Sequence, residues 1–264
     1  MDRSYLVLDI ETILDPELPI SESSNVERLP APPHHQIVAI GVLWFDRNYS
    51  VLRIGVIGED KTEAEALLDF TRFTEERQPH LVTYNGRGFD LPVLASRCLR
   101  HGIPFRYYYQ SRDVRYRFSP DGHLDLMDFI ADFGAARTAR LDVMAKLCGM
   151  PGKVGVDGKD VGPLVHAGQI EQVRNYCLCD VVQTAGVFLR IQLLRGSAPG
   201  APRRDDRRSQ QTQPCVTQRV HWPTSREVRR PEADRRTSLL FLSSFSQEDY
   251  RGYPGRVARS RLRG

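Results

Sequence analysis

The sequence has no apolar run long enough to span a membrane, and it has few cysteines. Its longest uninterrupted apolar stretch covers residues 37–45, far short of the roughly 20 residues that cross a bilayer. The five cysteines are an odd number spread between Cys98 and Cys215, unlike the dense disulfide framework of a small secreted domain. Because Asp2 and Arg3 directly precede a strand-like segment, we expect no secretory signal. The short apolar runs and the few cysteines further lead us to expect no membrane partner and a cytoplasmic location.

Positive charge is scarce in the first three quarters of the chain. Residues 1–196 hold 22 Lys and Arg against 26 Asp and Glu, whereas residues 197–264 hold 15 Arg, no Lys and seven acids. We expect a folded domain over residues 1–196 and an Arg-rich tail, disordered or loosely attached, over residues 197–264. The tail is open to two interpretations, an arm that contacts nucleic acid or a segment without chemistry.

Strand and helix patterns alternate along residues 1–196, which indicates an α/β layer fold. Apolar patterns predict strands over residues 5–10, 37–46, 49–57, 81–84 and 124–127. Helical spacing and helix-ending residues predict helices over residues 60–78, 91–101, 141–148 and 169–194. Residues 14–36 are rich in Pro and Ser, and we expect them to form a surface loop.

Two acids interrupt the first strand pattern. Asp9 and Glu11 alternate with Leu8 and Ile10, so a period of two places both carboxylates on one face. Like charges held side by side resist ionising together, and a divalent cation removes that penalty. Acids that reach solvent at a strand end are the alternative interpretation.

A glycine turn and a further acid follow the fourth strand pattern, in residues 85–90. Its two glycines let the backbone approach a ligand closely, while Asn85 and Phe89 offer a hydrogen-bonding group and a stacking face. Asp90 therefore has a functional interpretation beside these groups. Because Leu91 and Pro92 follow it, Asp90 also fits the N-cap of the next helix.

Tyr176 and Asp180 are four residues apart on the last predicted helix, so they share one face. A phenol one turn from a carboxylate can hydrogen-bond a water beside a metal ligand. We expect Cys177 and Cys179 to point away from this face and to act as small packing residues.

In this order, the three segments resemble the motifs of the DEDD superfamily of 3′–5′ exonucleases, and the tyrosine spacing resembles its DEDDy branch. The sequence segments LDIET, YNGRGFD and YCLCD are most similar to motifs of the exonuclease domain of family B DNA polymerases and of the stand-alone predicted exonucleases related to it. The resemblance covers residues 4–195 and extends to segments 124–126, 141–151 and 155–158.

The resemblance implies an RNase H-like fold, a five-stranded mixed sheet with flanking helices. It further implies that two Mg²⁺ or Mn²⁺ ions are held by four acids, Asp9, Glu11, Asp90 and Asp180. Asp9 would bridge the ions and Tyr176 would position the attacking water. Thr12, Asn85 and Phe89 would contact the terminal nucleotides of the substrate.

The implied activity is metal-dependent hydrolysis of phosphodiester bonds at 3′ ends of single-stranded or frayed nucleic acid, with DNA favoured and nucleoside 5′-monophosphates released. The tail is too short and too low in complexity to encode a polymerase domain, so we expect any proofreading to occur in trans with a polymerase or repair assembly. A catalytically silent RNase H-like module that binds nucleic acid and an RNA-trimming exoribonuclease are the alternatives.

Several other polar residues have weaker patterns. Asp125 and Asp128 are expected to be solvated or helix-capping acids. The alternative is that they hydrogen-bond to the groups that hold the metal-binding residues in place. Five histidines show no metal spacing and are expected at the surface, namely His34, His35, His80, His101 and His123.

Overall fold

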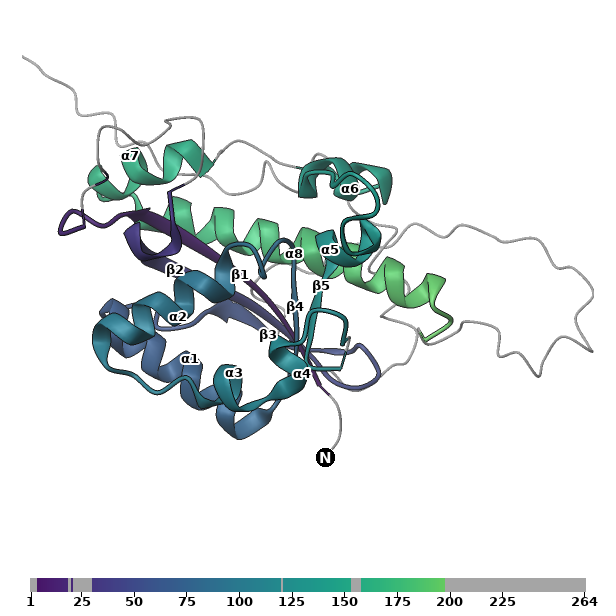
Figure 1. Cartoon of the computed structure of the whole chain (residues 1–264). Coiled ribbons are helices and arrows are strands. Elements are labelled where there is room, and N and C mark those ends of the chain that lie inside the picture. Colours follow the sequence, from purple (N-terminus) through teal and green to yellow (C-terminus); the bar gives the residue numbers. More distant parts are fainter. Residues whose placement is uncertain (1–3, 19, 21–29, 120, 153–157, 198–264) are drawn as a thin grey trace, which may run out of the picture.

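Strand β1 (Tyr5–Leu14) is the central strand of a five-stranded mixed sheet with the order β3-β2-β1-β4-β5 (Figure 1). It pairs antiparallel with β2 (His35–Phe45), which pairs antiparallel with β3 (Val51–Val56). On its other edge β1 pairs parallel with β4 (His80–Thr83), which pairs parallel with β5 (His123–Asp125). The structure is a computed structural model that describes residues 4–18, 20, 30–119, 121–152 and 158–197.

Side chains of β1 alternate between two hydrophobic cores on opposite faces of the sheet. Leu6, Leu8 and Ile10 are buried in a core that contains residues of helices α1 and α2, whereas Val7 is buried in a second core with residues of α8. Each buried aliphatic side chain contributes about 1.5–3 kcal/mol. The same period of two places Asp9 and Glu11 on the α8 face.

Helices cover both faces of the sheet (Figure 1). The three longest are α1 (Glu63–Arg77), α2 (Asp90–His101) and α8 (Ile170–Leu194). The shorter helices are α3 (Arg106–Gln110), α4 (Arg112–Arg115), α5 (Leu126–Ile130), α6 (Leu141–Leu147) and α7 (Val161–His166), with 3-10 turns at Pro32–His34, Asp132–Gly134 and Gly158–Asp160.

The predicted mixed sheet of five strands is confirmed, and the four predicted helices are present with slightly shifted ends. The strand prediction over residues 124–127 is wrong at its end, because the Asp125 carboxylate accepts the backbone N–H groups of Met127 and Asp128 and so begins α5. Sequence patterns do not predict α3, α4 and α7, which have only five, four and six residues.

The loop prediction over residues 14–36 is wrong at both ends. Strand β1 extends to Leu14, and β2 begins at His35, so that Leu14 pairs with His35 in the sheet. Residues 19 and 21–29 of this segment lie outside the described residues, as do residues 153–157 and residues 198–264 of the predicted tail.

Helix α8 is the one helix in the described part of the chain that is long and apolar enough to cross a membrane, with a mean hydropathy of 1.4 over its most apolar window. However, 67% of that window is buried inside the protein. The helix packs against β1 and β2 in the second core. Its apolar character is therefore explained by its place in the core.

Candidate active site

The two acids of β1 lie where the strand faces α8. Glu11 is only 8% exposed and Asp9 is half-buried. Across the β1–β2 pair, Asp9 is opposite Gly41 and Glu11 is opposite Ala39, so the residues facing both acids on β2 are small. The register shifts directly after Glu11, and irregularities of this kind are common next to functional sites because they re-aim side chains.

Asp90 reaches the same strand from the start of α2. Its Oδ1 accepts a hydrogen bond from the backbone N–H of Ile10 at 3.2 Å, and the side chain is 4% exposed. Strand β4 pairs with β1 only as far as Val7. The Asp90 carboxylate therefore accepts a hydrogen bond from a backbone N–H of β1 that lies beyond the last residue paired with β4. The N-cap interpretation is wrong, because the cap position is Phe89 and no side chain caps this helix.

The turn before α2 is fixed by an acid on the neighbouring strand. The carboxylate of Asp125 accepts the backbone N–H groups of Asn85 at 3.0 Å and Arg87 at 2.9 Å. Asn85 has a φ of 69°, a left-handed conformation that asparagine tolerates better than most residues. Asp125 thus caps α5, as predicted, and also shapes the turn that carries Asn85 and Phe89.

Tyr176 and Asp180 project from α8 and are 7% and 8% exposed. The Tyr176 hydroxyl donates a hydrogen bond to the Asp180 carboxylate, and the ring packs in a small apolar cluster with Val161 and Val173. Burial, and then the negative charges of Asp180, Glu11 and Asp9, hold the pKa of Tyr176 above its usual value. The phenol therefore remains protonated at neutral pH.

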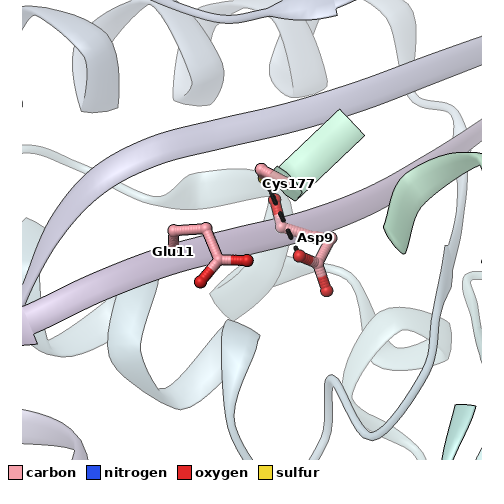
Figure 2. A group of neighbouring side chains, drawn as sticks. All are labelled: Asp9, Glu11 and Cys177. Carbon is pink, nitrogen blue, oxygen red and sulfur yellow. Dashed lines mark hydrogen bonds between the residues drawn. The ribbon is translucent and has the colours of Figure 1, made fainter. Parts of the chain in front are cut away.

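Cys177 does not point away from the acids, so that prediction is wrong. Its Sγ lies 3.5 Å from the backbone oxygen of Asp9 and 3.7 Å from Asp9 Oδ2, and Figure 2 shows the side chain beside that carboxylate. Cys177 is three residues from Asp180, a spacing that makes the two neighbours on a helix surface. Cys179 is half-buried and is not in this group.

Ligand atoms of Asp9, Glu11 and Cys177 all lie within 4.8 Å of one another (Figure 2). Among the described residues this is the one group of three or more acids, histidines and cysteines at such distances. Asp90 and Asp180 are outside that group, but both carboxylates act electrostatically on Asp9. The structure thus brings two of the four predicted acids, Asp9 and Glu11, together with a thiol, whereas Asp90 and Asp180 lie outside this group of close ligand atoms.

The crowding of these acids perturbs their protonation. Burial, and then the charges of Asp90, Glu11 and Asp180, raise the pKa of Asp9 well above its usual range. Burial above all, with a contribution from Asp125, raises the pKa of Asp90 to about 7. Carboxylates that repel one another in a low-dielectric site are stabilised by a divalent cation, and hard oxygen ligands suit Mg²⁺ or Mn²⁺. The donor set therefore fits a divalent metal.

Two histidines predicted at the surface are buried, and one of them adjoins the predicted substrate contacts. His35 is 4% exposed, its Nδ1 is 2.9 Å from Thr12 Oγ1, and its ring meets the Phe89 ring edge-on at 4.9 Å. His123 is 1% exposed, and its Nε2 is 2.8 Å from Thr83 Oγ1. Periodicity gave no signal for His35, because the residues before it belong to the predicted loop.

Comparisons with known proteins bear on the family and the fold of the chain. A family model described as "Predicted 3'-5' exonuclease related to the exonuclease domain of PolB" matches residues 29–220. That range contains the turn at residues 85–90 and helix α8 but begins after β1. Asp9 and Glu11 are therefore placed beside the matched region by the structure.

The chain is also similar to the solved structure of the family B DNA polymerase from the hyperthermophilic archaeon Pyrobaculum calidifontis. The identity is 22% and the TM-score is 0.50, over 75% of this chain and 26% of the polymerase chain. The chain thus spans about a quarter of the length of that polymerase, and the similarity shows the fold. No curated protein matches the chain.

Proposed function

Since this chain belongs to the family of predicted 3′–5′ exonucleases related to the exonuclease domain of PolB, we propose that it is a metal-dependent 3′–5′ exonuclease. It hydrolyses phosphodiester bonds at the 3′ ends of single-stranded or frayed nucleic acid, DNA in preference to RNA, and releases nucleoside 5′-monophosphates. The observation that carries the proposal is the close approach of Asp9 and Glu11, whose ligand atoms lie within 4.8 Å of each other and of Cys177, with Asp90 hydrogen-bonded to the backbone of Ile10 between them.

Asp9, Glu11, Asp90 and Asp180 are the residues that would hold two Mg²⁺ or Mn²⁺ ions. When bound, such a pair of ions supplies Lewis-acid stabilisation for the attacking and the departing oxygen of a phosphoryl displacement. In the protein itself, burial of the carboxylates fixes where their negative charge lies. The hydrogen bond from the Ile10 N–H holds Asp90 in place.

Tyr176 has the role of orienting the attacking water. Burial and the neighbouring acids keep its hydroxyl protonated by raising its pKa, and the lone pairs of the phenol oxygen can accept a hydrogen from a water. A buried ring in an apolar cluster keeps that oxygen in one position. This is a positioning contribution to catalysis.

The terminal nucleotides of the substrate would contact Thr12, Asn85 and Phe89. Asn85 and Phe89 lie on the turn that Asp125 holds, and the Phe89 ring contacts His35, which in turn contacts Thr12. A stacking face and two hydrogen-bonding groups, from residues that adjoin Glu11 or precede Asp90 in the sequence, support this part of the proposal. A cytoplasmic location and a polymerase or repair partner in trans are parts of the same proposal.

Stepwise digestion of a 5′-labelled single strand tests the function. With Mg²⁺ or Mn²⁺ the parent protein should give a ladder that shortens from the 3′ end, with nucleoside 5′-monophosphates as the released products, and a chelator should stop it. Asp9→Asn should abolish the ladder, while Glu76→Gln, which changes an exposed acid on α1, should leave it unchanged. Equal digestion by the Asp9→Asn variant would overturn the assignment.

A further inference from the structure

Exposed aromatic rings and arginines gather on the segment that contains α3 and α4. Tyr109, Tyr116 and Phe118 are 56%, 49% and 55% exposed, although rings of this size are usually well buried in a soluble domain. Arg112 and Arg115 are exposed on the same segment. We call these five residues the Arg–aromatic surface.

The arginines of this surface are stacked on its rings. The Arg112 guanidinium lies 5.8 Å from the centre of the Tyr116 ring, and the Arg115 guanidinium lies 5.3 Å from that of Tyr109. The rings of Tyr116 and Phe118 meet edge to face at 5.8 Å. Stacked guanidinium groups are held in place by the ring faces and keep their charge and hydrogen donors at the surface.

Two neighbouring arginines differ from Arg112 and Arg115 in that they form ion pairs with acids. Arg106 forms an ion pair with Glu75, and Arg117 forms one with Asp128 at 2.6 Å. Arg112 and Arg115 have no ion-pair partner among residues 4–18, 20, 30–119, 121–152 and 158–197. Their charge is therefore available for a phosphate.

A single side chain ties the Arg–aromatic surface to the candidate active site. The guanidinium of Arg87 donates hydrogen bonds to the backbone oxygens of Val114, Arg115 and Tyr116, at 3.2, 3.3 and 3.2 Å. The backbone of Arg87 belongs to the turn that precedes Asp90, and Asp125 holds it there. The surface and the turn are thus fixed to each other by hydrogen bonds.

We propose that the Arg–aromatic surface binds the part of a single-stranded nucleic acid that lies 5′ of the scissile bond. The inference rests on the proposed function, because the terminal nucleotide would occupy the site beside Asp90. Rings on which bases stack, alternating with cations that reach phosphates, are the features that hold single strands without sequence preference. An apolar protein partner would not require two stacked arginines whose charge is unpaired within the described residues.

Binding of a labelled oligonucleotide in the presence of a chelator tests the inference on the full chain. Tyr116→Leu and Phe118→Leu should each weaken binding of a long single strand by roughly tenfold. Arg112→Gln and Arg115→Gln should each reduce the slope of log affinity against log salt by about 0.7. Arg53→Gln is the matched control, because Arg53 is exposed on β3 at the opposite edge of the sheet.

A second measurement shows where on the protein the single strand binds. It distinguishes binding at the Arg–aromatic surface from binding by the tail, residues 197–264. A single strand with one photoreactive 5-iodouracil several nucleotides from its 3′ end should cross-link to the peptide that contains Tyr116 and Phe118. Matched DNA and RNA strands show whether the surface distinguishes the sugars. Binding by all four variants at the parent affinity, or cross-links confined to other peptides, would overturn the inference.

Hydrolysis of the p-nitrophenyl ester of thymidine 5′-monophosphate separates this inference from the proposed function. The ester contains a single nucleotide, which would occupy the terminal site, so Tyr116→Leu should cleave it at the parent rate while binding the long strand more weakly. A parent protein that cleaves neither the ester nor the long strand would contradict the proposed function alone. Equal strand affinity of parent and variants would contradict the surface alone.

Discussion

The thiol sulfur of Cys177 lies 3.7 Å from Oδ2 of Asp9, so α8 meets the central strand at the acid itself. Gly41 permits this approach. It is opposite Asp9 in the β1–β2 pair, and a Cβ at this position would lie 2.7 Å from the Cys177 sulfur. Because Tyr176 and Asp180 are on the same helix, the contact between Cys177 and β2 sets how far both side chains lie from Asp9.

Gly41→Ala should therefore impair the candidate site without introducing any charge. The added methyl group would displace Cys177 and with it α8, and a shift of about 1 Å in a catalytic group can cost roughly 100-fold in rate. Cys177→Ala in the same chain should restore much of the lost exonuclease rate, since it removes the clashing sulfur. Gly55→Ala is the control, because a Cβ there meets nothing within 4 Å; equal rates for both single variants would contradict the account.

Tyr176→Phe should lower the exonuclease turnover number by roughly 100-fold, within the range that a group acting on a proton transfer contributes. The ring and its apolar contacts remain, so the thermal midpoint and the affinity for Mn²⁺ should change little. The assay compares single-turnover rates at saturating metal. An unchanged rate would remove the hydroxyl from the mechanism.

Asp125→Asn should loosen the turn that carries Asn85 and Phe89. The carboxylate accepts four backbone N–H groups, those of Asn85, Arg87, Met127 and Asp128, and an amide has only one acceptor oxygen to offer them. Leaving buried donors unsatisfied costs about 1–3 kcal/mol. We expect a lower free energy of unfolding and a KM for oligonucleotide that rises more than kcat falls.

Asp128→Asn is the matched control for that variant, because it changes an acid on α5, the helix that Asp125 caps, whose ion-pair partner, Arg117, has a side chain that is half exposed. Exposed ion pairs contribute about 0–1 kcal/mol, so this change should have little effect on the free energy of unfolding or on KM. If both variants behaved alike, the role assigned to the Asp125 hydrogen bonds would be wrong.

Arg97→Met should destabilise the protein by about 3–5 kcal/mol at neutral pH, because it removes the buried cation that pairs with both of two nearly inaccessible carboxylates. Arg97 bridges Asp15, just after β1, and Glu63 at the start of α1, and both acids are nearly inaccessible. Urea unfolding measures the change. Arg100→Gln, which alters a more exposed neighbour, should cost much less.

The same ion pairs predict how stability depends on pH. Burial alone would raise the pKa values of Asp15 and Glu63, but hydrogen bonds, from Arg97 above all, more than offset it and lower both. This contribution is present above the unfolded pKa near 4 and is lost as the pH falls through the folded values. In Arg97→Met, acid protonates the two carboxylates that have lost Arg97 and so lowers the cost of burying them. The difference in stability between parent and variant should therefore shrink on acidification; a constant difference would contradict the pairing.

Sequence periodicity predicted the elements whose patterns are local. Alternation along β1 placed Asp9 and Glu11 on one face, and the spacing of Tyr176 and Asp180 placed them on one side of α8. Asp90 stayed ambiguous because its partner, the Ile10 N–H, belongs to a strand 80 residues away. Local sequence cannot show which backbone N–H of β1 has no partner on β4 and is therefore available to Asp90.

Other errors have the same origin in tertiary contacts. Cys177 was assigned to the wrong side because α8 is buried over much of its surface, so its helical pattern does not single out one face. His35 is buried because β2 begins two residues before the apolar run that starts at Ile37. The histidine therefore pairs with Leu14 in the sheet. The short helices α3 and α4 hold too few residues for a period to be read, and with them the Arg–aromatic surface escaped prediction.

Equilibrium binding of Mn²⁺, followed through the electron paramagnetic resonance signal of the free ion, tests the central claim most directly, because it needs no substrate. The account predicts that the parent protein takes up Mn²⁺ and that Asp9→Asn loses most of this affinity, while Glu76→Gln binds as the parent does. Equal binding by the parent and Asp9→Asn would contradict the claim that these carboxylates form a metal site.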